Sequence, residues 1–226
     1  MPPTAIGPTE PRTPDTALTA FASMVRAKAR GGANNAIADP VAGSGVWWPH
    51  ARRCLSPNQD SRPDDSQPEL IVVHAISLPP GEFGGPFIEQ LFCNQLNPEA
   101  HPYFAGIADL RVSAHVLIDR VGQTTQFVPF DRRAWHAGVS SWRGRDRCND
   151  FSIGIELEGC EERPFTTPQY VVLARMIRWL ASRYPVLARE NALAGHSDIA
   201  PGRKTDPGPH FDWARLEQCL REEPLF

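Results

Sequence analysis

The residue types best suited to chemistry gather in the segment 195–208, where His196, Lys204 and Asp206 lie on backbone rich in glycine and proline. Imidazole and carboxylate groups are ligands that zinc accepts, and the lysine places a positive charge two residues before the aspartate. In extended backbone, side chains two residues apart point the same way, so Lys204 and Asp206 can face one cavity. This pattern favours a reaction in which negative charge develops beside a metal. The same residues are also ordinary in a solvated loop, so the segment alone leaves a structural role open.

Two further candidates come from segments that read as strands. Residues 70–76 are β-branched and apolar on both faces, which predicts a strand covered on both sides, and the breakers at 77–81 place His74 near its exit. Residues 151–159 alternate between an apolar face and a face that carries Glu156 among glycines. If that face lines a cleft, partial desolvation raises the pKa of Glu156 toward the range of a general base. A core histidine and a solvent-facing glutamate remain the alternatives.

The elements that must position these residues follow from hydrophobic periodicity and breakers. The pattern predicts a short helix over 86–94, a hairpin of strands 111–118 and 123–128, a helix from 166–169 to Tyr184, and a last helix after the N-cap Asp212. His115 lies within the first hairpin strand, which favours a structural role over metal binding. Strands interleaved with helices predict an α/β fold in which helices cover a mixed central sheet.

Composition limits the possible partners and the compartment. With 226 residues, a formal net charge of -3 and a pI near 6.2, the chain has no global charge for nucleic acid or an anionic membrane. The five cysteines are odd in number and show no CxxC pair, which indicates a reducing compartment. The first thirty residues hold no run of signal-peptide type, and no apolar stretch is long enough to span a bilayer, so we expect a cytoplasmic protein.

The domain organisation follows from a change in composition. Residues 1–45 are rich in proline, alanine, threonine and glycine, which predicts a flexible N-terminal extension. Apolar density rises from Trp47 onward, and we expect residues 46–226 to form one domain.

Several long motifs, in order, resemble the AmpD family of cytoplasmic 1,6-anhydro-N-acetylmuramoyl-L-alanine amidases of Gram-negative bacteria, which are type 2 N-acetylmuramoyl-L-alanine amidases. The motifs lie at 73–85, 101–104, 111–115, 133–138, 148–159 and 204–208, within a likeness that covers roughly residues 47 to 215. The resemblance implies a zinc amidase fold related to peptidoglycan-recognition proteins. It also implies site roles: His74, His196 and Asp206 as ligands of Zn²⁺, Glu156 as the base, Lys204 as the charge beside the oxyanion, and His115 as a non-ligand.

The implied reaction is hydrolysis of the amide bond between the lactyl group of anhydro-N-acetylmuramic acid and L-alanine, in peptidoglycan recycling. A small muropeptide is then the expected partner of a monomer. Trp135 is a candidate to stack on the substrate, and Arg111 and Arg147 are candidates to bind its carboxylates, although each is as readily a structural tie. The chain departs from the family pattern at Ala75, where asparagine is expected, and at 197–198, where Ser-Asp replaces Cys-Asn.

Two other readings compete with this one. A peptidoglycan-fragment binding module without activity is disfavoured because the full set of ligands, base and lysine is present. An exported amidase that lyses the intact wall requires an export signal, and the N-terminal residues offer none of recognisable type.

Overall fold

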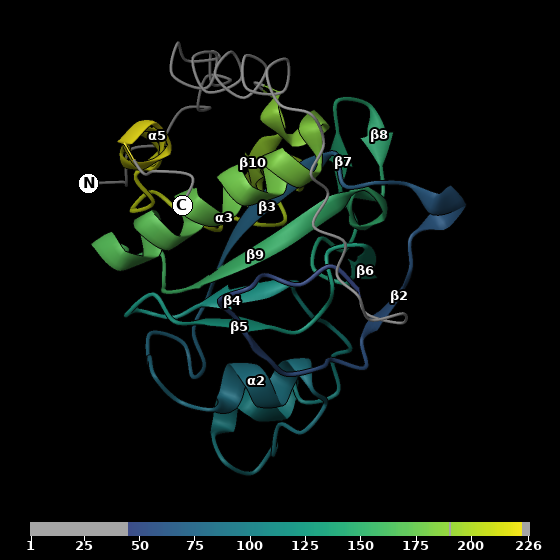
Figure 1. The fold of residues 1–226 in the computed structure, drawn as a ribbon. Helices are drawn as coiled ribbons and strands as arrows, with labels where there is room; N and C mark the ends of the chain where they lie inside the picture. The colour runs from purple at the N-terminus through teal and green to yellow at the C-terminus, as the bar shows by residue number, and fades with distance from the viewer. Residues whose placement is uncertain (1–44, 190, 223–226) are drawn as a thin grey trace, which may run out of the picture.

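The computed structural model describes residues 45–189 and 191–222, so the predicted extension over 1–45 lies almost wholly outside the described residues. In this part of the chain six strands form one sheet in the order β1-β5-β4-β9-β3-β10 (Figure 1). The strands are β1 (Arg52–Arg53), β3 (Leu70–Ile76), β4 (Val116–Ile118), β5 (Thr124–Gln126), β9 (Ser152–Glu158) and β10 (Leu193–Gly195). Neighbouring strands are parallel except the β4–β5 hairpin, which is antiparallel.

Helices and small ribbons complete the domain. The α-helices are α2 (Phe87–Phe92), α3 (Thr167–Arg183), α4 (His196–Ile199) and α5 (Trp213–Glu222). Short 3₁₀ helices are η1 (Pro63–Asp65), η2 (Pro102–Gly106), η3 (Cys148–Asp150) and η4 (Pro185–Ala188). Two antiparallel ribbons pair β2 (Gln59–Ser61) with β6 (Arg132–Ala134) and β7 (Ser141–Trp142) with β8 (Arg145–Asp146). None of the helices in the described residues combines the length and apolarity needed to cross a membrane.

The α/β fold with a mixed central sheet and covering helices is confirmed, and so are most of its predicted elements. β3 has the predicted bounds, and β9 is shorter than predicted by one residue at each end. The predicted first hairpin strand, however, begins only at Val116, so His115 lies at its entrance and not within it. The chain bends at His115, whose N–H donates to the carbonyl of Gly154 and whose own carbonyl accepts from Phe127.

Local signals set the bounds of α3. Thr166 accepts a hydrogen bond from the N–H of Gln169 at 3.4 Å, and the Gln169 side chain accepts from the N–H of Thr166 at 3.0 Å, which is a capping box. Pro168 in the first turn needs no hydrogen-bond donor there, and Pro185 follows the C-cap Tyr184. The helix therefore begins where the sequence predicts and ends at Arg183, one residue before the predicted end at Tyr184.

The two faces of the sheet have different covers. On one face, alternate residues of β3, β4 and β9 pack in one apolar cluster with buried side chains of α3 and α5. Figure 1 shows α3 running along β3 and β9. On the opposite face, α2 packs its Ile88, Leu91 and Phe92 in a second cluster with Phe127. The rest of that face packs Leu70 and Val72 in a third apolar cluster with Phe151 and Ile199, and it also holds the polar residues described next.

Candidate active site

Strand register places two of the predicted site residues side by side. β3 and β9 are parallel neighbours, and His74 is the register partner of Glu156. Because side chains alternate along a strand, both project from the face opposite α3, while Val73 and Ile155 project toward α3. The face of β9 that carries Glu156 is therefore the face of β3 that carries His74.

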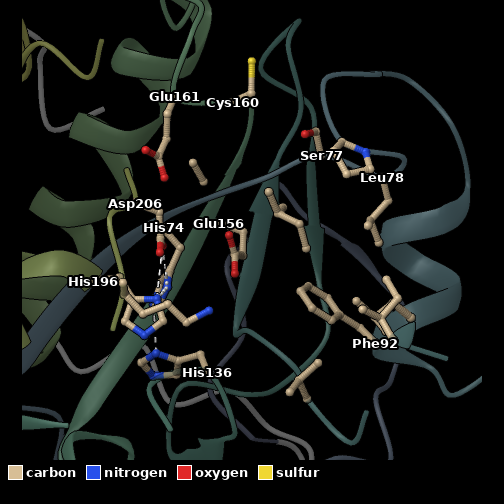
Figure 2. Close-up of a pocket in the computed structure, with 18 of the residues that line it drawn as sticks. His74, Ser77, Leu78, Phe92, His136, Glu156, Cys160, Glu161, His196 and Asp206 are labelled. Atoms are coloured by element: carbon tan, nitrogen blue, oxygen red, sulfur yellow. Dashed lines mark hydrogen bonds and ion pairs between the residues drawn. The ribbon is translucent and has the colours of Figure 1, made fainter. Parts of the chain in front are cut away.

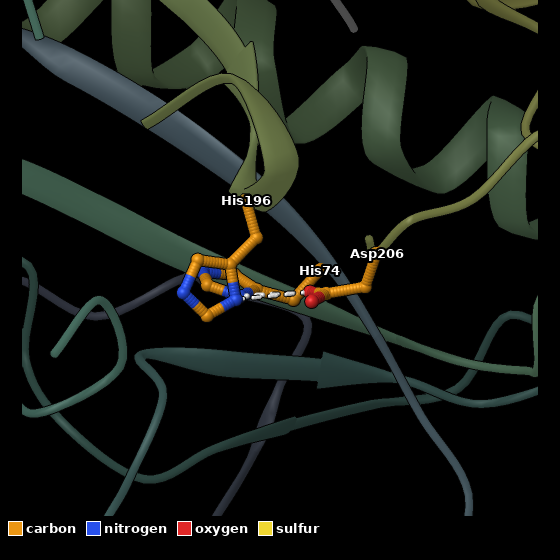
Figure 3. Close-up of side chains that lie close together, drawn as sticks. All are labelled: His74, His196 and Asp206. Carbon is orange, nitrogen blue, oxygen red and sulfur yellow. Dashed lines mark hydrogen bonds and ion pairs between the residues drawn. The ribbon is translucent and has the colours of Figure 1, made fainter. Parts of the chain in front are cut away.

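The segment 195–208 joins them from the edge of β3. β10 pairs with β3 in parallel and ends at Gly195, the partner of Val73, so His196 begins α4 beside His74. The chain then returns, and the N–H of Ser197 donates to the carbonyl of Asp206 at 2.9 Å. This hydrogen bond holds the two ends of the segment together and brings the Asp206 carboxylate to the two imidazoles (Figure 3).

The three side chains present one donor atom each to a common point. Nδ1 of His74 lies 2.9 Å from Nδ1 of His196, and Oδ2 of Asp206 lies 3.3 Å and 3.1 Å from these two atoms. Ligands about 2.0–2.1 Å from a tetrahedral zinc lie roughly 3.3 Å from one another. The triangle of atoms therefore has the dimensions of three corners of a zinc-type site. Figure 3 shows the three side chains turned toward one another.

Protonation of these groups suits a metal ion. Burial is the main cause that lowers the pKa of His74 to about 4, so at neutral pH its imidazole is uncharged and can offer a lone pair. Burial opposes ionisation of Asp206, but the imidazoles of His196 and His74 beside it outweigh this effect and lower the pKa of the carboxyl. Two imidazole nitrogens and one carboxylate form a donor set that zinc accepts.

Glu156 is a buried acid with an unused oxygen. Its relative exposure is 9%, and its Oε2 has no hydrogen-bond partner among the described residues. Burial raises the pKa of Glu156 well above its ordinary value, the charge of Asp206 raises it further, and the charge of Lys204 opposes the rise. A carboxylate whose pKa is raised is a stronger base than an ordinary glutamate, which suits it to accept a proton.

All of these groups line one cavity of about 670 Å³. Figure 2 shows Glu156 between the three candidate ligands and an apolar wall that includes Leu78 and Phe92. Lys204 and Trp135 line the same cavity. The structure therefore brings together the predicted ligands, base and lysine, and one of the three predicted substrate contacts.

The two predicted arginines lie elsewhere. Arg111 is exposed, and its neighbours Leu110 and Val112 line the cavity while Arg111 itself does not. Arg147 is exposed and forms an ion pair with Asp150 at 3.0 Å, outside the cavity. Their contact with substrate carboxylates stays a prediction.

One member of the site was not singled out from the sequence. His136 lines the cavity, and its Nδ1 lies 2.9 Å from Nε2 of His74. It lies outside the strands of the main sheet, so the alternation of apolar and polar residues along a strand does not identify it. The signal that was available is a histidine next to Ala137 and Gly138 in the motif at 133–138.

Comparison with known proteins decides the family. The family model described as N-acetylmuramoyl-L-alanine amidase matches residues 64–209, which include every residue of the site. The chain belongs to this amidase family. The expectation that it is an enzyme of this class, resembling AmpD, is thereby confirmed.

Individual amidases of the family are similar over most of the described chain. The 1,6-anhydro-N-acetylmuramyl-L-alanine amidase AmpD of Citrobacter freundii is 63% identical over 174 residues, which are 77% of this chain and 92% of that protein. A crystal structure of a selenomethionine AmpD derivative is 59% identical, with a TM-score of 0.76, and covers 80% of this chain and 99% of its own. AmpDh3 of Pseudomonas aeruginosa, in complex with an anhydromuramic pentapeptide, is 27% identical, with a TM-score of 0.53, over 71% of this chain and 62% of its own.

Proposed function

We propose that this amidase uses Zn²⁺ to hydrolyse the amide bond between the lactyl group of 1,6-anhydro-N-acetylmuramic acid and the L-alanine of the stem peptide. The observation that carries the proposal is the convergence of His74, His196 and Asp206 beside a buried glutamate with an unused oxygen, in one cavity. The printed names of the relatives support the choice of linkage, because AmpD is named for the 1,6-anhydro substrate and AmpDh3 is described with an anhydromuramic peptide.

The metal would be held by Nδ1 of His74, Nδ1 of His196 and Oδ2 of Asp206. Zinc in such a site supplies Lewis acidity, which polarises a carbonyl and lowers the pKa of water to about 7. The low pKa of His74 keeps its imidazole neutral at neutral pH, so that one of its two ring nitrogens has a free lone pair.

Glu156 and Lys204 have separate roles in the reaction, namely proton transfer and stabilisation of negative charge. Glu156 accepts the proton of the attacking water at its free oxygen and returns it to the departing amine of L-alanine. Its raised pKa makes the carboxylate a stronger base than an ordinary glutamate, and burial is the largest cause of the rise. Lys204 places its positive charge on the same cavity, where it stabilises the negative charge that develops on the amide oxygen.

The cavity matches a small substrate of mixed polarity. About 670 Å³ is within the range of small-molecule sites, and an apolar wall faces the charged groups across it. Trp135 on the lining offers an aromatic face for a sugar or a stem peptide. Arg111 and Arg147 remain proposed contacts for the carboxylates of a longer stem peptide. A muropeptide is the proposed partner of a monomer, and the proposed zinc amidase domain spans 46–226.

The proposed setting is peptidoglycan recycling in the cytoplasm. All five cysteines are free thiols, which is consistent with a reducing compartment. A substrate that carries the anhydro sugar is a released fragment and not the intact wall, which fits an enzyme that acts on small molecules.

Mass spectrometry of the products tests this function. The purified protein with zinc is incubated with a 1,6-anhydromuropeptide and, separately, with the corresponding ordinary muramoyl peptide. We expect release of the intact stem peptide, and of anhydro-N-acetylmuramic acid from the first substrate. If neither substrate releases a stem peptide, the proposal is wrong.

A matched pair of glutamates supplies the control. Glu158 lies two residues from Glu156 on the same face of β9 and is also buried, but its oxygens accept from the N–H groups of Gly84 and Arg120, outside the cavity. Glu158→Gln should retain turnover, whereas Glu156→Gln should lose it. If both variants lost turnover equally, the loss in Glu156→Gln would be explained by the change of a buried charge and not by the loss of a proton-transfer group.

A further inference from the structure

Both imidazoles of the candidate metal site turn the same nitrogen toward Asp206. His74 and His196 each present Nδ1 to the carboxylate, so each directs Nε2 away from it. A neutral imidazole carries one proton, and a nitrogen that binds a metal must be without it. Each Nε2 must therefore hold the proton and needs an acceptor.

Two consecutive residues offer those acceptors. Nε2 of His196 lies 3.3 Å from the carbonyl oxygen of Ala137, and Nε2 of His74 lies 2.9 Å from Nδ1 of His136. A carbonyl can only accept, so the bond to Ala137 requires a proton on Nε2 of His196. The bond to His136 is ambiguous by itself, because either imidazole can be the donor.

The surroundings of His136 remove that ambiguity. Its Nε2 lies 3.2 Å from Oγ of Ser152, and the Ser152 hydroxyl donates to the carbonyl of Cys148 at 2.6 Å. The hydroxyl has one hydrogen, which that carbonyl takes, so Oγ accepts from Nε2–H of His136. Nδ1 of His136 is then an acceptor, and it takes the proton that His74 carries on Nε2. Because the carbonyl of Cys148 can only accept, it determines which group donates in each of the bonds that link Ser152, His136 and His74.

The local fold is built around the position of His136. Oδ1 of Asn149 accepts from the N–H groups of His136 and Ala137, at 3.1 Å and 2.8 Å, and so fixes both acceptors with one side chain. The imidazole lies against Gly154 of β9, where a Cβ atom would be 2.4 Å from Cγ of His136. Only glycine leaves room for the ring at this point of the strand.

We propose that His136 is a positioning residue for the metal: through Ser152 and the carbonyl of Cys148 it holds His74 in the tautomer that leaves Nδ1 free to bind. This inference rests on the proposed zinc site. His136 contacts His74 at Nε2, the nitrogen that is turned away from Asp206, so it acts through His74 and is not itself a ligand. Partners of this kind orient a ligand and typically change metal affinity by about 10–100-fold.

Zinc affinity of the whole chain, measured by competition with a chromogenic chelator, tests the role. His136→Leu removes the acceptor and should weaken Zn²⁺ binding by about 10–100-fold. His136→Asn keeps an amide oxygen near the position of Nδ1 and should restore most of the affinity. The rescue by asparagine separates an acceptor role from simple filling of space.

His115 provides the matched control. It is fully buried, its ring centroid is 5.7 Å from that of His136, and its nitrogens meet the N–H of Gly154 and the carbonyl of Arg132 without touching a candidate ligand. His115→Leu should lower the melting temperature but leave Zn²⁺ affinity unchanged. Equal loss of affinity in His115→Leu and His136→Leu would overturn the positioning role.

A second readout does not require any variant to fold. Long-range ¹H–¹⁵N spectra of the zinc-free protein report which imidazole nitrogen carries the proton. We expect His74 and His136 as Nε2–H tautomers, and a proton on Nδ1 of His74 would overturn the inference. If the unaltered protein binds no zinc, the proposed function fails and the positioning role with it. Unchanged affinity in His136→Leu overturns the positioning role alone.

Discussion

Beside the cavity, the two faces of β3 and β9 carry different kinds of residue on the same strands. Toward α3, the side chains of Val73, Ile153 and Ile155 are fully buried and apolar. Toward the cavity, the same strands present His74 and Glu156, which are nearly as buried but polar. Burial of apolar surface stabilises the fold, whereas burial of an acid with an unused oxygen costs stability. The comparison indicates that the face toward α3 contributes only to the fold, whereas the opposite face also positions the residues of the candidate site.

Loss of a candidate ligand on the cavity face should have the largest effect on zinc binding and on amidase activity. His74→Ala removes one of the three donor atoms, so zinc binding should fall steeply and amidase activity should drop to the uncatalysed background. Metal analysis and turnover of an anhydromuropeptide check this together. Full activity in the alanine variant would exclude His74 as a ligand.

Glu156→Gln should lower turnover by about 10²–10⁴-fold while zinc binding is retained, because a proton-transfer group is lost and the ligands are not. The same change should stabilise the zinc-free protein. Burial raises the pKa of Glu156 in the folded state, so the stability that this group contributes is present below its unfolded pKa and is lost as pH rises through the folded value.

The sign of this effect can be measured by thermal melts at two pH values. The melting temperature of Glu156→Gln should exceed that of the unaltered protein at pH 8, and the difference should vanish near pH 4. In the unaltered enzyme, activity should fall as pH drops through the raised pKa, because the base becomes protonated. A lower melting temperature at both pH values would mean that Glu156 stabilises the fold.

On the opposite face, Ile155→Ala should affect stability and spare the chemistry. Deletion of a fully buried side chain of this size typically costs about 2–5 kcal/mol, and each kcal/mol lowers Tm by roughly 2–4 °C in a protein of this length. Well below the melting temperature, zinc content and kcat/KM should match the unaltered protein. A large loss of kcat/KM in a folded Ile155→Ala variant would break the separation of the two faces.

Lys204→Met should have the smallest effect on the fold and a selective effect on the reaction. The residue is exposed, so melting temperature should not change. Loss of one stabilising charge typically lowers kcat by about 10²–10³-fold, and KM should change less. Steady-state kinetics check this, and an effect on KM alone would assign Lys204 to substrate binding.

Sequence reasoning reached the local elements well because their signals lie within a few residues. The run of β-branched residues predicted β3, and Thr166 with Gln169 predicted the start of α3. The shortened hairpin strand shows the limit of such patterns, because the bend at His115 depends on its bonds with Gly154 and Phe127, which are distant in sequence. Hydrophobic periodicity along the chain gives no information about hydrogen bonds between residues so far apart.

The site shows the same limit more clearly. Residue types marked His196 and Asp206 as candidates, but their convergence with His74 depends on the pairing of β10 with β3, across a separation of 122 residues between the two histidines. The ligand set therefore came from family resemblance and not from spacing. His136 was missed because its role depends on hydrogen bonds to His74 and Ser152, which only the folded chain brings together.

Titration of the zinc-free enzyme with Zn²⁺, with turnover of an anhydromuropeptide followed at each addition, tests the central claim most directly. We expect no turnover without metal, a linear rise in activity, and a break at one zinc per chain, with no such rise in His74→Ala. Full turnover by the metal-free protein, or an equal rise in His74→Ala, would contradict the assignment of His74, His196 and Asp206 as a catalytic zinc site.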